Sequence, residues 1–496
     1  MFNQIVGNFF SYTSLLEICI QTNIVISIST LFINAIILLI SSTQKNNILP
    51  TLLKLWLPLS FFIGLFLQLL ALYAFISDST WELLSNEYIC VNSVSTLFSS
   101  KYGYISIDLF GITLVLLAYI VGFLSLLNLT DKVFWSSLNQ TLLFNYFIVV
   151  VMLFVCCDDI YIFFILYELL LLPSLILVYY NSPNKKGIQA ALYFLIWTQL
   201  GSLLVFLAIT RISTASGLTM IHQLRAITFS ESDIIYIKLL LFFGFGFKIP
   251  IWPFHYWLTK THVEAPGSFS MYLSGFLVKT ALFGLYKLFL VLNFPTNNIF
   301  LLVIASIGVV DASLKMWAQI DLKKLVAFCT IQEMNLIVMC FLFGYSSIVS
   351  VGILFCFMHA LLSTLMFFLV DCIQRRFQSR QTAEVIGIIH ITPNLGLASI
   401  AMVLMYLAIP GTLKFSCEFM LFCYLADTSF FIFFIILISA STIAPIAFAK
   451  LWYGCIFGTP THNMQTNNDL THKELVIILI CLILLILLSA LSYSFF

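Results

Sequence analysis

Charged residues are scarce in this sequence. Only 9% of its 496 residues are Asp, Glu, Lys or Arg, whereas 61% are hydrophobic, and the mean hydropathy is +1.08. A soluble chain carries about 25% charged residues, so this one has too few to cover its surface in water. The scarcity excludes a soluble globule and indicates a surface that faces lipid. The net charge of +1 gives no reason to expect a nucleic-acid partner.

Closely spaced cysteines and a targeting segment are also missing. None of the 12 cysteines stands in Cys-x-x-Cys spacing, which zinc and iron–sulfur sites usually need. We therefore interpret the cysteines as packing residues and expect no redox centre, metal or cofactor in this chain. Residues 1–16 lack the pattern of a cleavable signal or transit peptide. The richness in Phe, Ile, Leu, Tyr and Asn fits an AT-rich, organelle-encoded gene.

About fourteen stretches of the chain are apolar enough to cross a bilayer, since a span needs about 20 mostly apolar residues. No shift in composition separates a soluble domain from these stretches. We therefore predict an all-α membrane protein with about 14 transmembrane helices. The predicted spans centre near residues 31, 64, 117, 147, 170, 198, 246, 278, 308, 333, 361, 408, 441 and 483.

Charges of opposite sign alternate between the predicted loops. The odd-numbered loops carry basic residues: Lys45, Lys132, Lys185, Lys186, Lys260, Lys315, Lys323, Lys324, Arg375, Arg376, Arg380, Lys450 and Lys473. The even-numbered loops carry acidic residues, with Lys101, Arg211 and Arg225 as exceptions: Asp78, Glu82, Glu87, Asp158, Asp159, Glu231, Asp233 and Asp427. This split supports the span count. It predicts that the odd loops face the matrix or cytoplasm, with both termini on the opposite side.

Four charged residues are predicted to lie inside spans: Glu168, Lys248, Lys279 and Glu418. A charge at mid-bilayer costs about 2.5–3.5 kcal/mol on insertion scales, so such residues are functional candidates. Buried carboxylates and amines can exchange protons near neutral pH, and a Glu–Lys pair can be switched by separating its partners. The alternative is a side chain that reaches the interface or a static ion pair between helices.

Two of the predicted spans are interrupted by proline. Pro250 and Pro253 follow Lys248, and Pro410 precedes Glu418. Proline removes a backbone donor, so the freed carbonyls need water or a polar partner. One interrupted span in each half is typical of transporters built from repeats, and we predict two inverted five-helix repeats, each with a broken helix. The predicted parts are 1–105 (helices 1–2 and a loop), 106–292 (third helix and first repeat), 293–458 (second repeat) and 459–496 (last helix).

Histidines are further candidates, because imidazole relays protons near neutral pH. His255 and His262 flank the first break, and His359 lies deep in a predicted span. The alternative for each is a hydrogen-bonded core residue. Asp108 is interpreted as a helix cap. Asp321, Lys323 and Lys324 are interpreted as an interface cluster, and Glu333 is a candidate without a second signal.

Four ordered motifs stand between residues 248 and 419: KIPIWPFHYWLTKTHVEAPGS at 248–268, DLKKLVAF at 321–328, FMHALL at 357–362 and PGTLKFSCEF at 410–419. Together they resemble the antiporter-like membrane subunits of respiratory complex I, the NADH:ubiquinone oxidoreductase. The resemblance extends from about Ser106 to Tyr424. Thr259 and Thr261 depart from the family's usual Pro and Ala in the loop after the first break.

The resemblance implies roles for the buried charges. Glu168, Lys248, Lys279 and Glu418 match the family's fifth-, seventh-, eighth- and twelfth-helix positions, and Glu418 separates this chain from chains 2 and 5, which generally place Lys there. The implied function is proton translocation. We expect Glu168 to pair with Lys248 at rest. After separation, we expect Lys248 to pass its proton through Lys279 and water, past His359, to Glu418.

The resemblance also implies the surroundings of the chain. We expect a subunit of an enzyme in the mitochondrial inner membrane, with the positive loops on the matrix side. Its partners would be other membrane-arm subunits, especially chains 2 and 5, and membrane lipids, with cardiolipin a candidate. FMN, iron–sulfur clusters and ubiquinone are expected in partner subunits. Two alternatives stay open: a subunit of a multi-subunit cation/proton antiporter, which shares these residues, and a structural scaffold with static ion pairs.

Overall fold

The structure is a computed structural model that describes residues 19, 22–30, 63–70, 89–91, 105–128, 134–181, 184–291, 299–343, 346–459 and 469–492. These residues are almost entirely helical, with one two-stranded sheet. Nine helices among them are long and apolar enough to cross a membrane. The predicted all-α, multi-pass membrane class is therefore confirmed. The predicted centre at residue 31, and most of segment 1–105 with its loop, lie outside the described residues.

The predicted span centres fall on helices with few exceptions. Helices occupy centres 117, 147, 198, 246, 278, 308, 333, 361 and 483. The centre at 170 falls between two collinear helical pieces that together span Ile160–Tyr179. The centre at 408 falls on a break between helices, and the centre at 441 falls in a π-helical turn.

The described chain packs as two compact units. Unit 1 takes in the described parts of Met1–Leu177, Ser202–Leu241 and Phe283–Phe294. Its strands β1 and β2 pair antiparallel, and α5 and α7 both pack on α6. Its elements are β1 (Ile89–Val91), β2 (Ile105–Ile107), α5 (Leu109–Leu127), α6 (Phe134–Cys156), α7 (Ile160–Leu169), α10 (Ile221–Leu224) and parts of α8 (Leu171–Asn181), α9 (Lys185–Ser216), α11 (Glu231–Lys248) and α14 (Val278–Val291).

Unit 2 takes in the described parts of Val178–Gly201, Phe242–Leu282 and Pro295–Phe496. It holds the rest of α8, α9, α11 and α14, and two π-helical turns, η2 and η3. Its other elements are α12 (Tyr256–Glu264), α13 (Gly267–Tyr272), η2 (Leu273–Leu277), α15 (Ile299–Trp317), α16 (Leu322–Phe343), α17 (Ser346–Phe377), α18 (Ile388–Ile391), α19 (Pro393–Tyr406), α20 (Leu413–Thr428), α21 (Phe430–Ile438), η3 (Ser439–Ile443), α22 (Ala444–Phe457) and α23 (His472–Ser492).

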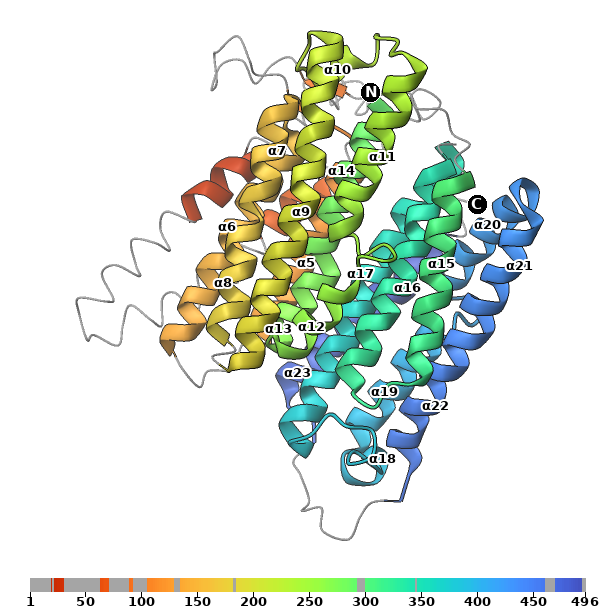
Figure 1. Ribbon diagram of the computed structural model, residues 1–496. Helices are drawn as coiled ribbons and strands as arrows, with labels where there is room; N and C mark the ends of the chain where they lie inside the picture. Colours follow the sequence, from red (N-terminus) through yellow and green to blue (C-terminus); the bar gives the residue numbers. More distant parts are fainter. Residues whose placement is uncertain are drawn as a thin grey trace, which may run out of the picture. The chain divides into compact units, whose positions relative to one another are not determined.

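Helices α16 and α17 form the core of unit 2 (Figure 1). Nearly every residue of α16 is buried. Most of its side chains are apolar, and they occur on all faces of the helix. A helix that is hydrophobic all round is stable only when it is enclosed. Helix α17 packs against α13, η2, α16, α19, α20 and α23, so side chains on α16 and α17 lie deep within this unit.

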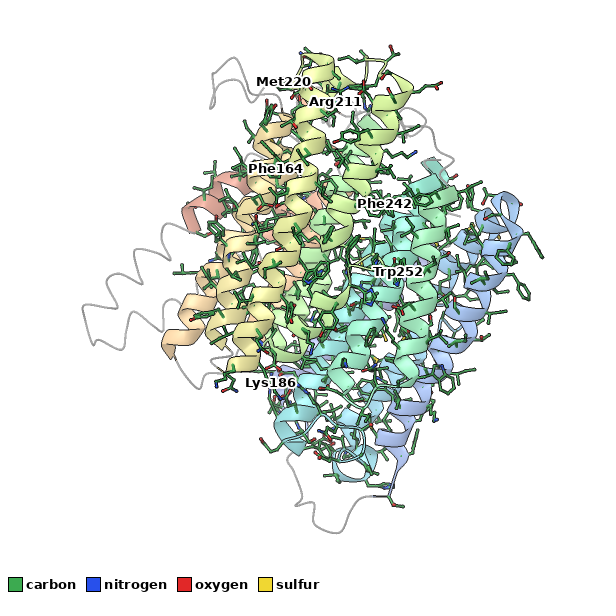
Figure 2. The ribbon with its side chains drawn as sticks, viewed as in Figure 1. Phe164, Lys186, Arg211, Met220, Phe242 and Trp252 are labelled. Carbon is green, nitrogen blue, oxygen red and sulfur yellow. The ribbon has the colours of Figure 1, made fainter. Side chains whose placement is uncertain are left out.

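Both predicted helix breaks are present. Helix α11 ends at Lys248 and α12 begins at Tyr256, with Trp252 in the connection (Figure 2). The indole Nε1 of Trp257 donates to the Phe247 carbonyl at 2.7 Å, which satisfies an acceptor near the end of α11. The second break separates α19 from α20, where Gly411 has φ of +100°, a conformation that favours glycine.

The predicted division into 1–105, 106–292, 293–458 and 459–496 concerns internal repeats. Compact packing does not test repeats, so this division stays a prediction. The predicted hydrophilic break at 459–473 is described only at its two ends.

The close approach of α16 and α17 leaves little room for a side chain at Gly352. A methyl group added there would lie 2.9 Å from Cys340 Cβ, an atom fixed to the backbone of α16. We expect Gly352→Ala to lower stability by about 1–3 kcal/mol through overpacking, seen as a lower melting temperature of the purified protein. The control is Gly454→Ala in α22, where no atom lies within 4 Å. Equal melting temperatures for the two variants would contradict the helix packing.

Candidate functional site

A carboxylate in the middle of α16 organises the buried charges of unit 2. Glu333 is 2% exposed. Its Oε2 lies 2.6 Å from Nδ1 of His359 on α17, and its Oε1 accepts from Nζ of Lys414 on α20 at 2.7 Å. Both oxygens of one buried carboxylate are therefore engaged, each by a group that can carry a proton.

Lys414 is shared between two carboxylates. Its Nζ lies 2.7 Å from Glu333 Oε1 and 3.6 Å from Glu418 Oε1, and all three side chains are buried. Lys414 and Glu418 are four residues apart on α20, so they lie on one face of the helix. The two unequal distances leave Lys414 bound mainly to Glu333, with Glu418 within reach of a small movement.

The break before α20 explains why Lys414 needs two carboxylates. Thr412 caps the helix by accepting from the Phe415 amide, which places Lys414 in the first turn. The positive end of the helix dipole disfavours a cation there. The face of Tyr406 compensates in part, since Lys414 Nζ lies 3.6 Å from the ring centroid. The Tyr406 hydroxyl donates to Gln332 Oε1 at 2.8 Å, which fixes the ring.

The cluster of Glu333, His359, Lys414 and Glu418 has one carboxylate more than it has ammonium groups. With a neutral imidazole, its formal charge is −1. A buried net charge is costly, and one proton on His359 or on Glu418 would neutralise it. Because the sites interact this closely, such a proton belongs to the cluster as a whole.

Lys279 lies at a backbone irregularity next to this cluster. It is fully buried, and its Nζ donates to the Ser274 carbonyl in η2. The π-helical turn η2 packs against α17, and π-turns inside helices are frequent at functional sites. Lys279 is close enough to act electrostatically on His359, Glu333 and His262. Its charge therefore acts on the cluster without a direct ion pair.

The two other predicted histidines belong to different surroundings. His255 Nε2 lies 3.1 Å from Lys315 Nζ and 3.3 Å from Asp311 Oδ2 on α15. His262 is fully buried and stacks on Phe367, with ring centroids 4.4 Å apart. Neither ring nitrogen of His262 has a hydrogen-bond partner within the described part of the chain. Of the three, only His359 touches the Glu333 cluster.

The remaining two predicted relay residues lie in different units. Lys248 ends α11 in unit 2 and is 3% exposed. Glu168 lies on α7 in unit 1 and is partly exposed. Their pairing stays a prediction.

The structure makes Glu333 and Lys414 central to the cluster. The sequence names Glu333 only as a candidate without a second signal and places Lys414 only at a break. The i, i+4 spacing of Lys414 and Glu418 is the one pattern that could have indicated the pair. Lys323, interpreted as an interface residue, is buried and donates to the Ala265 carbonyl. Asp108 is a helix cap, as interpreted.

No group of three or more His, Cys, Asp or Glu side chains is placed to hold a metal ion in the described ranges. The chemistry available to the cluster from these side chains is proton transfer between carboxylate, imidazole and amine groups.

Removing the shared lysine tests this geometry. Lys414→Met leaves two buried carboxylates without their cation, and breaking a buried pair costs about 3–5 kcal/mol. We expect a marked fall in melting temperature that a second change, Glu333→Gln, partly restores.

The control is Lys315→Met, because Lys315 is half-exposed and pairs with Asp311 on its own helix. Exposed pairs contribute about 0–1 kcal/mol, so little change is expected. Equal effects of Lys315→Met and Lys414→Met would contradict the buried cluster.

Comparison with known proteins agrees with the motifs. Residues 157–444, more than half of the chain, match the family described as NADH:quinone oxidoreductase/Mrp antiporter, TM. A protein from Paramecium tetraurelia named NADH-ubiquinone oxidoreductase chain 4 is 45% identical over 438 residues, which are 88% of this chain and 92% of that protein.

Solved structures share the fold at low sequence identity. A chain of respiratory complex I from Thermus thermophilus has a TM-score of 0.77 at 18% identity, over 94% of this chain and 95% of that one. A chain of the Mrp complex from Dietzia sp. has a TM-score of 0.81 at 14% identity, over 96% and 95%. These two likenesses show the fold alone. The family match and the Paramecium relative show that the chain belongs to the NADH:quinone oxidoreductase/Mrp antiporter membrane family. Within this family it belongs to the NADH-ubiquinone oxidoreductase chain 4 proteins, in agreement with the glutamate at position 418.

Proposed function

We propose that this chain is a proton-translocating membrane-arm subunit of a mitochondrial NADH:ubiquinone oxidoreductase, and that the Glu333 cluster is its proton-holding site. The observation that carries the proposal is the buried excess of one carboxylate over one ammonium in Glu333, Glu418 and Lys414. A static scaffold would gain nothing from such an excess, because a balanced ion pair or an apolar packing is less costly.

The shared lysine gives the cluster two states. In the first, Lys414 binds Glu333, as in the structure. When His359 takes up a proton, its imidazolium supplies the counter-charge of Glu333, and Lys414 can move toward Glu418. In the second state, Lys414 binds Glu418 and stabilises it as a carboxylate. When Lys414 returns to Glu333, Glu418 loses its counter-charge and accepts the proton that His359 gives up.

His359 has the connections that a relay needs. Its Nδ1 contacts Glu333, and its Nε2 is buried without a hydrogen-bond partner among the described residues. That second nitrogen can receive a proton from Lys279 through an intervening water, since a water can bridge buried polar groups. The path proposed in unit 2 runs from Lys279 past His359 and Glu333 to Glu418.

The earlier part of the path rests on sequence. Glu168 and Lys248 match the family's fifth- and seventh-helix positions, and we propose that they deliver the charge that starts the transfer. Redox energy would come from partner subunits that hold FMN, iron–sulfur clusters and ubiquinone. The proposed location is the mitochondrial inner membrane, beside the chain 2 and chain 5 subunits, with the positive loops on the matrix side.

The Mrp antiporter shares this fold, so a cation/proton exchanger is the second candidate. The two differ in what they assemble with. Isolation of the chain together with flavin and iron–sulfur subunits supports the oxidoreductase. Isolation with other antiporter subunits alone, and Na⁺- or K⁺-driven proton movement without NADH, supports the exchanger.

Glu333→Gln is the direct test of the cluster. Glutamine keeps the shape and can still accept from Lys414, but it removes the excess negative charge. We expect NADH-driven proton translocation in vesicles containing the purified complex to fall about tenfold or more, since a positioned acid–base group contributes about 10²–10⁴-fold. The measurement is the fluorescence of a pH-sensitive dye inside the vesicles, relative to NADH oxidised.

The matched control is Glu384→Gln, because Glu384 is exposed and its partner is Ser379. It is expected to translocate normally. Normal translocation by Glu333→Gln would remove the cluster from the mechanism.

The predicted role of Glu168 has its own test. Glu168→Gln is expected to abolish most translocation in the same vesicles, because a neutral amide cannot form the proposed ion pair with Lys248. Unchanged translocation would rule out Glu168 as the group that starts the transfer, while leaving the Glu333 cluster untouched.

A further inference from the structure

Asp108 and Lys287 are among the buried ionisable residues of unit 1 that the path described above does not use. Asp108 stands immediately before α5, and Lys287 lies on α14. Asp108 is 7% exposed and Lys287 is fully buried. A buried acid and a buried base in one apolar unit call for an explanation, because each costs free energy to bury.

Lys287 is held by backbone and aromatic groups. Its Nζ donates to the carbonyls of Val155 at 3.1 Å and Cys157 at 2.8 Å, at the C-terminal end of α6. Its ammonium also lies 5.5 Å from the ring centroid of Phe283 and 5.9 Å from that of Phe163. The negative end of a helix dipole and two aromatic faces all favour a cation. Lys287 is therefore stable as a charged group without touching a carboxylate.

Asp108 is only half satisfied. Its Oδ1 accepts from the Gly111 amide at 2.9 Å and caps α5. Its Oδ2 is buried and has no hydrogen-bond partner in the described part of the chain. Capping needs one oxygen, and Ser, Thr or Asn would serve as well without burying a charge. The second oxygen, Oδ2, is therefore not needed for capping.

The two groups converge on the same small region of unit 1. A methyl group placed on Gly111 would lie 2.5 Å from Val155 Cγ1, 2.6 Å from Asp108 Oδ1 and 3.6 Å from the Phe283 ring. Val155 is also an acceptor for Lys287, and Phe283 is one of its two aromatic neighbours. Of the charged groups that act electrostatically on Asp108, Lys287 has the largest effect and Arg225 follows.

We propose that Asp108 is a proton-exchange group of this chain, with Lys287 as its fixed counter-charge. Its free oxygen is the site that gains or loses the proton, and Lys287, held nearby by the end of α6, favours the ionised state in apolar surroundings. Because Asp108 stands at the first residue before a membrane-spanning helix, it marks a point where protons pass between the aqueous edge and the interior of unit 1. This inference rests on the proposed function of proton translocation.

The experiment uses Asp108→Asn in the purified complex reconstituted in vesicles. Asparagine caps a helix as well as aspartate does, but it cannot exchange the proton. We expect proton translocation per NADH oxidised to fall severalfold while the melting temperature of the complex stays unchanged. The matched control is Asp159→Asn, the same change at the cap of α7, where Oδ1 accepts from the Tyr161 and Ile162 amides. That variant is expected to translocate normally.

Each outcome decides the matter. Full translocation by Asp108→Asn, or an equal loss in Asp159→Asn, would show that Asp108 is only a cap. If Asp108→Asn does not assemble, Asp108→Ser supplies a smaller neutral cap that must show the same loss. Glu333→Gln is measured in parallel. Loss there with normal translocation in Asp108→Asn overturns this inference alone, whereas normal translocation in both also removes the Glu333 cluster from the mechanism.

Discussion

Two carboxylates that compete for one buried ammonium are the interaction on which the architecture of unit 2 depends. Glu333 and Glu418 can share Lys414 only if water cannot take the place of its ammonium group. The cluster must therefore be enclosed. The apolar helices α16 and α17 provide that enclosure. In low dielectric, each proton or lysine movement changes the energy of its neighbours strongly. The same residues at an exposed surface would form weak, screened pairs.

Irregular backbone accompanies three of the buried lysines of unit 2. Lys248 is the last residue of α11, Lys279 follows the π-turn η2, and Lys414 is in the first turn after the second break. At such points carbonyls are released from the helix ladder and can accept from an ammonium, as Ser274 does from Lys279. Irregular backbone at membrane depth is tolerated only where it is buried in protein or lines a wet cavity. The π-turn is thus part of how the charge of Lys279 is held.

The sequence predicts the fold well and the site only in part. Hydropathy defines spans because length and apolarity are local properties, and proline marks both breaks because its effect is local too. Partner choice is tertiary. Glu333 and Glu168 are each a single carboxylate in an apolar run, and nothing local says that one of them meets Lys414. His255, His262 and His359 are all candidates in the sequence, yet only α17 brings its histidine to Glu333.

Two groups of buried charges are satisfied in different ways, and the difference bears on function. In the Glu333 cluster of unit 2 the charges satisfy one another, so a proton entering the cluster rearranges partners. In unit 1 the ends of helices hold Lys287, at the end of α6, and Asp108, at the start of α5. A group held by backbone keeps its position when its neighbour changes protonation. Such a group suits a fixed point of proton entry or exit, whereas a cluster of competing side chains suits a switch.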